Sequence, residues 1–281
     1  MFTRERTIAI VLALLLGGAA FVYGLRSLEW HMTFHPVPMN AELQSPPDGA
    51  AQVWFNTADG IRLHGWFFES RTKPEAATII FFHGNSGNIR DVGWLGQRLQ
   101  ERGFNVLLFD YRGYGASGDV PDGETGLYTD GDAAVGFVMN EKGVRPENIV
   151  LYGQSLGTTV VADVASRQNV GAVIIESGLS SASSVAAHAL PWLPQQLHFL
   201  AKNRFESARK LVKIKAPVLI THGDPDPVLP TSEAQLLFAA ANEPKRLLIF
   251  PGAGHNVFGS LGAPYLDQIA EFIRQSGASH P

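Results

Sequence analysis

A serine between two glycines stands where a strand would turn into a helix. The segment Gly153-Gln154-Ser155-Leu156-Gly157 follows the apolar run IVLY and precedes a stretch with helical character. Such a turn forces the serine backbone into a strained conformation, and larger residues beside it would clash. The hydroxyl would stand at the carboxyl edge of a sheet, with a helix N-terminus behind it that favours developing negative charge. The pattern predicts Ser155 as a nucleophile, and a tight glycine-rich turn without chemistry is the alternative.

A serine hydroxyl is a poor nucleophile at neutral pH unless a base takes its proton, and the base needs an orienting acid. In chains with this turn the order is serine, acid, histidine. Of the nine histidines, only His255 and His280 follow the late apolar runs. His280 stands next to the C-terminus, where chains are commonly poorly ordered, whereas His255 ends the short loop GAGH after the run LLIF. We therefore predict His255 as the base.

Three carboxylates are candidates for the acid. Asp226 lies in the loop HGDPDPVLP after the run PVLIT, where it would reach the other ring nitrogen of the base. Asp224, two residues earlier, would instead cap the turn. Glu176 is the last residue of the preceding strand VIIE, from which a carboxylate can also reach the site. Asp226 is the first choice. Its role would be to hold the histidine tautomer and to stabilise the imidazolium.

Acyl transfer also needs backbone N–H groups aimed at the developing negative oxygen. Leu156, the residue after the predicted nucleophile, should supply one of them. The other is expected from the small-residue loop FFHGNSGN at residues 81–88, with Asn85 as the first choice and Ser86 as the alternate. In this loop we expect His83 to hold the backbone through a hydrogen bond rather than to take part in catalysis.

These residues need a sheet whose strands alternate with helices. Apolar runs without strict alternation, which are typical of strands covered on both faces, lie at 77–82, 105–109, 148–152, 172–175, 217–221 and 246–250. Helical stretches lie at 92–102, 123–139, 156–166, 231–241 and 264–275. Segments 52–56 and 61–68 flank Asp59-Gly60 and predict a hairpin. The predicted fold class is α/β, with a mostly parallel sheet and right-handed crossovers.

The N-terminal residues 8–25 carry no charged side chain. As a helix they would span roughly 27 Å, close to the thickness of a bilayer's hydrocarbon core. Arg4 and Arg6 precede them, while Arg26 and Glu29 nearly cancel after them, so the positive-inside rule places the rest of the chain on the non-cytoplasmic side, periplasmic in a bacterium. We expect an anchor at 1–26, a proline-rich tether at 27–51 and a catalytic domain at 52–276. A signal peptide cleaved near Ala20 is the alternative.

Composition narrows the classes of function. Hydrophobic residues make up 45% of the 281 residues and charged residues 17%, as in a globular protein. The net charge of −4 gives no basic surface for nucleic acid. The absence of cysteine excludes a thiol nucleophile, a thiolate metal site and a disulfide scaffold. We expect neither a metal nor an organic cofactor.

Five segments together resemble the α/β-hydrolase superfamily over residues 52–275. They are FFHGNSGNI at 81–89, FDYRGYGASGD at 109–119, LYGQSLGT at 151–158, HGDPDPVLP at 222–230 and GAGHNV at 252–257. More closely, the chain resembles the membrane-anchored, Bem46-like group of serine hydrolases, which includes ABHD13-like and ABHD17-like proteins. The resemblance implies Ser155 as nucleophile, Asp226 as acid and His255 as base. It also implies hydrolysis of an ester, thioester or amide, and a lipid-modified substrate is a candidate because some relatives are acyl-thioesterases. At Val257 the chain departs from many relatives, which have an acidic residue there.

Residues 177–205 differ in character from the rest and would lie over the serine turn. Apolar side chains recur in this segment, and we expect a short cap in which Trp192, Leu193 and Leu197 line an acyl pocket. The alternative is that they only close the core over the sheet. With a membrane anchor nearby, we expect the cap to face lipid or a lipidated substrate.

The sequence thus predicts a single-pass membrane protein that cleaves an acyl ester or thioester through a Ser-His-Asp triad and an acyl-enzyme. Its expected partners are the membrane and a small acyl or lipidated substrate, without nucleic acid. A peptidase or amidase of the same fold is the enzymatic alternative. The alternative without catalysis is an anchored scaffold that uses the fold as an interaction surface.

Overall fold

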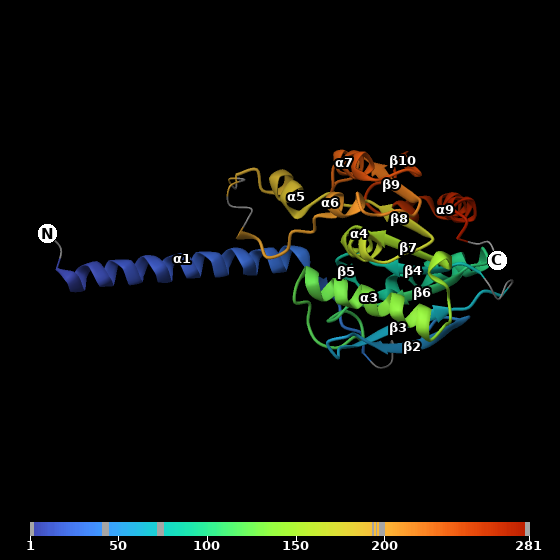
Figure 1. Cartoon of the computed structure of the whole chain (residues 1–281), viewed down its shortest axis with the longest axis horizontal. Coiled ribbons are helices and arrows are strands. Elements are labelled where there is room, and N and C mark those ends of the chain that lie inside the picture. The colour runs from blue at the N-terminus through green and yellow to red at the C-terminus, as the bar shows by residue number, and fades with distance from the viewer. Residues whose placement is uncertain are drawn as a thin grey trace.

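The computed structural model describes residues 3–40, 45–71, 76–192, 194, 196 and 200–278. A long N-terminal helix projects from a domain that is built on an eight-stranded sheet (Figure 1). The order of strands across this sheet is β10-β9-β8-β7-β4-β6-β3-β2. Only β2 and β3 run as a hairpin, and β3 is antiparallel to β6, whereas β6, β4, β7, β8, β9 and β10 are mutually parallel. The α/β fold with a mostly parallel sheet is thereby confirmed.

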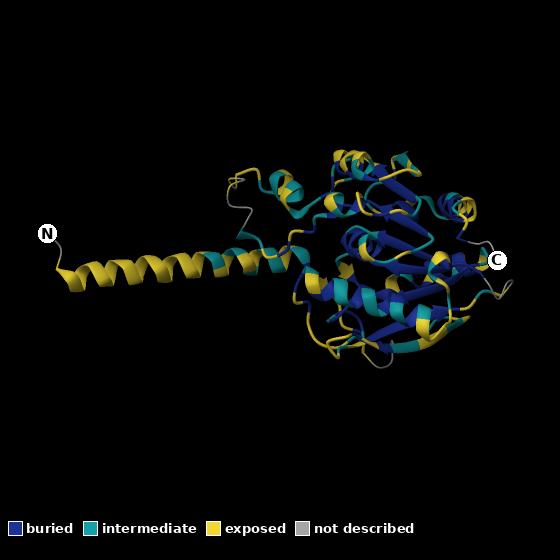
Figure 2. Cartoon of the chain, in the orientation of Figure 1, coloured by how far each residue is buried: buried dark blue, intermediate teal, exposed yellow. Residues whose placement is uncertain are grey.

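The strands follow the apolar runs of the sequence closely. Their bounds are β2 Ala50–Asn56, β3 Arg62–Phe68, β4 Thr78–Phe82, β6 Asn105–Phe109, β7 Ile149–Gln154, β8 Ala172–Glu176, β9 Val218–Asp224 and β10 Lys245–Pro251. The central strands β4, β6 and β8 are buried along their whole length (Figure 2). Such strands carry apolar residues at consecutive positions because helices cover both faces of a parallel sheet.

Successive side chains of a strand point to opposite faces, so the sheet divides the core in two. Ile80 and Phe82 face the side covered by α3, α4 and α7, and Ile79 and Phe81 face the side covered by α2, α8 and α9. The helices are α2 Gly93–Glu101, α3 Glu124–Asn140, α4 Gly157–Arg167, α5 Ala182–Ala189, α6 Ser207–Leu211, α7 Ser232–Ala240, α8 Val257–Leu261 and α9 Ala263–Gln275. The five predicted helices are present, and the short helices α5, α6 and α8 are additional to them.

The N-terminal helix α1 (Arg4–Thr33) is long and apolar enough to cross a membrane, with a mean hydropathy of 2.4 over a window in which no residue is buried. A signal sequence near an N-terminus meets the same criteria of length and composition. The helix continues past residue 26 into the segment predicted as a tether, because Trp30 packs against the domain and its Nε1 donates to the carbonyl of Pro121 at 2.9 Å. Directly after α1, β1 (His35–Pro36) pairs in parallel with β5 (Ser86–Gly87).

Candidate active site

Ser155 occupies a sharp turn between β7 and α4, near the centre of the sheet. Its φ of +50° lies in the left-handed region, which is rare for residues with a side chain. A β-carbon on Gly153 would lie 2.7 Å from the carbonyl oxygen of Gly157, and one on Gly157 would strike the carbonyl oxygen of Phe82. Both flanking glycines are thus required by close backbone approach. The turn holds the Ser155 hydroxyl at the carboxyl edge of the sheet.

The two other predicted members of the triad lie in loops at this edge. His255 follows β10 and Asp226 follows β9, and His255 Nδ1 lies 2.7 Å from Asp226 Oδ2. An ionised carboxylate can only accept, so Nδ1 carries the proton and Nε2 has its lone pair available to a reacting group. Among the described residues His255 makes no hydrogen bond to the Ser155 hydroxyl. In enzymes without substrate this contact is often long and shortens on binding.

The Asp226 carboxylate is fully enclosed and has several donors. Its Oδ1 accepts from the backbone N–H groups of Val228 at 2.7 Å and Leu229 at 3.0 Å, and His222 Nε2 lies 3.2 Å from Oδ2. Burial alone would raise the pKa of Asp226, but the hydrogen bonds from His222, His255 and these N–H groups outweigh it and hold the pKa well below its usual range. Asp226 therefore stays ionised opposite His255. Asp224, the alternative acid, is exposed at the end of β9.

Glu176, the third carboxylate considered as acid, has a different set of partners. It is completely buried at the end of β8, where Oε1 accepts from the N–H groups of Val257 at 3.0 Å and Phe258 at 3.2 Å. The hydroxyls of Tyr265, at 2.8 Å, and Tyr152 donate to Oε2. Burial raises the pKa of Glu176 even though these donors oppose the shift. The carboxylate thus holds the N-terminus of α8, directly after the loop that carries His255.

The main chain of Glu176 also reaches Ser155. Its carbonyl oxygen accepts from the Ser155 N–H at 2.9 Å. Glu176 therefore connects two parts of the site: its backbone bonds to the serine turn, and its side chain bonds to the residues that follow the loop of His255. The sequence predicted Glu176 near the site but did not reveal this function, because the N–H groups that its side chain holds belong to the main chain 81 and 82 residues away.

The predicted oxyanion donors lie in two loops that touch each other. A β-carbon on Gly84 would be 3.7 Å from the β-carbon of Ser155, so the loop after β4 runs directly beside the serine turn. Among the described residues, the N–H groups of Asn85 and Leu156 donate no hydrogen bond within the chain. Ser86, the alternate donor, belongs to β5 and pairs with His35. Two main-chain donors without internal partners therefore flank the serine turn.

Buried polar groups at the start of the loop after β4 stabilise this loop. His83 Nδ1 lies 2.7 Å from the Gly84 carbonyl oxygen, and its Nε2 lies 3.7 Å from the buried Asp110 carboxylate. Burial lowers the pKa of His83, which favours the neutral ring. With Nδ1 as the donor, the ring fixes the peptide between Gly84 and Asn85. This arrangement agrees with a supporting function for His83.

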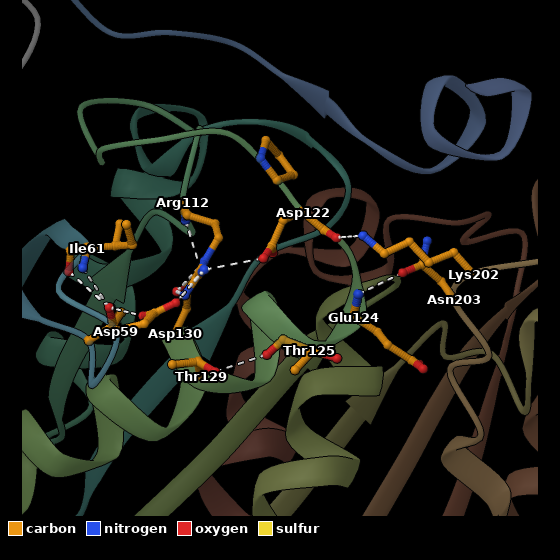
Figure 3. Close-up of polar contacts among 12 residues, drawn as sticks. Asp59, Ile61, Arg112, Asp122, Glu124, Thr125, Thr129, Asp130, Lys202 and Asn203 are labelled. Carbon is orange, nitrogen blue, oxygen red and sulfur yellow. Dashed lines mark hydrogen bonds and ion pairs between the residues drawn. The ribbon is translucent and has the colours of Figure 1, made fainter. Parts of the chain in front are cut away.

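A charged cluster holds the neighbouring loop, which follows β6. Arg112 is almost fully buried, and its guanidinium lies 2.8 Å from Asp130 and 2.9 Å from Asp59, with Asp122 at 3.7 Å (Figure 3). The Arg112 N–H also donates to Asp130 at 2.9 Å. Removing one partner from such a pair would leave an uncompensated buried charge. The cluster therefore fixes the loop that carries Tyr114, whose hydroxyl donates to the Asn85 carbonyl at 2.9 Å.

The segment predicted as a cap forms α5 and a following turn, and α5 has no buried residue. Trp192 is 69% exposed, so its side chain does not close the core. Leu193 and Leu197, the other predicted pocket residues, lie outside the described residues. Within the described part of the chain, no group of three or more histidine, aspartate or glutamate side chains could hold a metal ion.

Comparison with known sequences identifies relatives across most of the chain. The family model described as serine aminopeptidase, S33, matches residues 73–209. The Escherichia coli K12 protein YfhR is 36% identical over 236 residues, 81% of this chain and 81% of its own length. Human alpha/beta hydrolase domain-containing protein 17B is 36% identical over 224 residues, which are 78% of this chain and 73% of the human protein.

Solved structures share the architecture at lower identity. The Pyrococcus furiosus esterase Pf2001 superimposes with a TM-score of 0.64 at 21% identity, covering 86% of this chain and 98% of the esterase. Acetyl xylan esterase 1 from Thermoanaerobacterium superimposes with a TM-score of 0.65 at 21% identity, covering 83% of this chain and 85% of that enzyme. At this level of identity the likeness concerns the fold.

Proposed function

Because the chain belongs to the α/β-hydrolase superfamily, we propose that it is a serine hydrolase with Ser155, His255 and Asp226 as its triad. The observation that carries the proposal is the 2.7 Å contact of His255 Nδ1 with an Asp226 carboxylate that is enclosed and ionised, at the same sheet edge as a strained serine. The arrangement leaves His255 Nε2 as the free base. A binding scaffold would need none of these features.

In the proposed reaction, His255 Nε2 takes the Ser155 proton while the serine oxygen attacks the acyl carbon. The carbonyl oxygen becomes negative and is held by the N–H groups of Asn85 and Leu156. As the intermediate collapses, the alcohol or thiol leaves with the proton from Nε2 and an acyl-enzyme remains. Water then gives a proton to Nε2 and attacks the acyl carbon, which releases the acid and returns the proton to Ser155.

We assign the substrate class as an acyl ester or thioester, presented at a membrane. The length and exposed apolar surface of α1 support an anchor, and Trp192 is an exposed aromatic residue of the segment assigned as the cap. Arg4 and Arg6 before the apolar stretch favour a catalytic domain on the non-cytoplasmic side. N-terminal sequencing of the membrane fraction tests the anchor: an intact N-terminus is expected, and a chain beginning near Phe21 would contradict it.

The direct test uses the full-length protein in detergent. Wild type should react with a fluorophosphonate probe and hydrolyse short p-nitrophenyl esters, and Ser155→Ala should do neither. Matched esters, thioesters and amides should rank with the amide slowest. Rapid amide cleavage would favour the peptidase alternative, which the description of the matching family model suggests. A folded wild type that reacts with none of these compounds would leave only the scaffold alternative.

A further inference from the structure

The segment that joins α1 to the domain lies directly on the predicted oxyanion loop. We call residues 34–39 the strap. The His35 N–H donates to the Asn85 carbonyl at 2.9 Å, and β1 of the strap pairs with β5 of the loop. The Asn88 side chain donates to the carbonyl of Val37 at 3.1 Å. The strap therefore contacts this loop at both of its ends, Asn85 and Asn88.

The strap is itself held along its length. Phe34 and Met39, at its two ends, are 2% and 6% exposed and belong to the cores on opposite faces of the sheet. Gly115 donates its N–H to the carbonyl of Val37 at 3.1 Å and accepts from the Met39 N–H at 2.7 Å. A segment with buried ends and paired main-chain groups is a part of the domain rather than a loose connection.

The end of α1 is docked as well. The Glu29 carboxylate accepts from the N–H groups of Lys202 and Asn203 and from the Asn203 side chain, each at 2.7 Å. Asn203 in turn accepts from the Glu124 N–H at the start of α3, and Lys202 donates to the carbonyl of Asp122 (Figure 3). The helix thus enters the strap from a fixed position on the catalytic domain.

We propose that the strap, the segment leading from the apolar helix, is a positioning element of the active site that holds the oxyanion loop in place. This proposal rests on the serine-hydrolase function proposed above. The Asn85 carbonyl accepts two hydrogen bonds, one from His35 and one from the Tyr114 hydroxyl at 2.9 Å. Both bonds fix the peptide between Asn85 and Ser86. The Asn85 N–H, the predicted oxyanion donor, belongs to the adjoining peptide between Gly84 and Asn85, whose carbonyl oxygen lies 2.7 Å from His83 Nδ1. Because the peptides on both sides of the Asn85 α-carbon are held, this N–H keeps its direction. Loss of either donor lets that N–H turn away from the reacting oxygen, which raises the barrier without changing substrate binding.

The test uses full-length protein in detergent and p-nitrophenyl butyrate, a soluble ester whose hydrolysis does not depend on a membrane. His35→Pro removes the N–H donor, and Tyr114→Phe removes the second donor to the same carbonyl. His35→Ala keeps the N–H and loses only the 3.3 Å contact of His35 Nδ1 with the Asn85 side-chain amide. His35→Pro loses that contact as well, so the comparison of the two variants isolates the N–H donor. We expect His35→Pro and Tyr114→Phe to lower kcat and the rate of fluorophosphonate labelling by about ten-fold or more, with KM nearly unchanged. His35→Ala should remain clearly faster than His35→Pro, because it keeps the N–H donor to the Asn85 carbonyl.

Thermal unfolding of each variant separates positioning from folding. A His35→Pro protein that unfolds at the wild-type temperature and keeps the wild-type kcat would overturn the proposal. If His35→Pro does not fold, Tyr114→Phe decides, because it leaves the main chain of the strap intact: a wild-type kcat in that variant would also overturn the proposal. A wild type without labelling or turnover would instead refute the serine-hydrolase function on which the strap proposal rests.

Discussion

Replacing Glu176 by alanine and, separately, by glutamine would test how the loop that carries His255 is held. Alanine leaves the N–H groups of Val257 and Phe258 buried without an acceptor. Each such group costs about 1–3 kcal/mol, so the variant should lose roughly 2–6 kcal/mol of unfolding free energy. That is a large part of the roughly 5–15 kcal/mol that stabilise a typical domain. The two tyrosines keep other partners, because Tyr265 also bonds Thr221 and Tyr152 bonds Tyr265.

Glutamine should be far better tolerated. The side-chain oxygen of glutamine can accept from the N–H groups of Val257 and Phe258. Its NH₂ group can donate to the two tyrosine hydroxyls, which can act as acceptors as well as donors. Because burial raises the pKa of Glu176, folding favours the protonated form of this carboxyl group. The stability that this group contributes is therefore complete below the unfolded carboxyl pKa of about 4.3 and is lost as the pH rises through the folded value. Wild type should accordingly lose stability relative to Glu176→Gln as the pH increases above about 4.3.

Urea unfolding of full-length protein in detergent, followed by tryptophan fluorescence, gives the stabilities, and hydrolysis of p-nitrophenyl butyrate gives kcat and KM. A loosened histidine loop should lower kcat in Glu176→Ala by about 10- to 100-fold with little change in KM, since a misplacement of about 1 Å costs on that order. Glu176→Gln should remain within a few-fold of wild type. An alanine variant with wild-type stability and kcat would refute the assignment of Glu176 as the support of the loop.

Four further substitutions test the serine turn and the acid. Ser155→Gly and Ser155→Ala should both abolish turnover. Glycine adopts the positive φ of this residue without strain, so the glycine variant should be more stable than the alanine variant by about 1 kcal/mol in thermal unfolding. Equal stability of the two variants would argue against strain at this residue. Gly157→Ala should lower the unfolding free energy by more than about 2 kcal/mol and remove most of the activity, because the alanine β-carbon has no room beside the Phe82 carbonyl. A fully active, stable variant would contradict this geometry. Asp226→Asn should lower kcat by about 10⁴-fold. The pKa of Asp226 is lower in the folded chain, so its carboxylate stabilises the fold above about pH 4 and this contribution is lost as the pH falls further. Asp226→Asn should therefore flatten that loss in unfolding experiments between pH 7 and pH 3, and an unchanged pH dependence would refute the assignment.

The sheet could be predicted from the sequence because each buried parallel strand is a continuous apolar run. The run at 105–109 coincides with β6, and the ends of the other runs lie within three residues of the ends of their strands. The helix α5 escaped prediction because most residues of its segment ASSVAAHA are small and none of them is fully buried, so the segment shows no clear apolar periodicity. The strap escaped prediction for a different reason. Its partners in the loop lie about 50 residues away, and two prolines suggested a chain without regular structure.

The candidate site likewise has a part that could be predicted from the sequence and a part that could not. The contact between Asp226 and His255 could be predicted because both residues follow parallel strands, whose carboxyl ends lie at one edge of the sheet. The supporting function of Glu176 could not, since it depends on main-chain N–H groups that any sequence provides. Catalysis by the triad and the lining of the acyl pocket stay predictions for the experiments above.

The position of β10 has a consequence for heat inactivation. Among the described strands it is an edge strand, hydrogen-bonded only to β9, and none of its residues is fully buried. The strand that precedes Ser155, β7, is instead flanked by β4 on one side and β8 on the other. Local opening begins where backbone hydrogen bonds are least protected, so amide exchange should be faster in β10 than in β7. The histidine would then leave its place before the sheet melts, and esterase activity should disappear at a lower temperature than the fold itself.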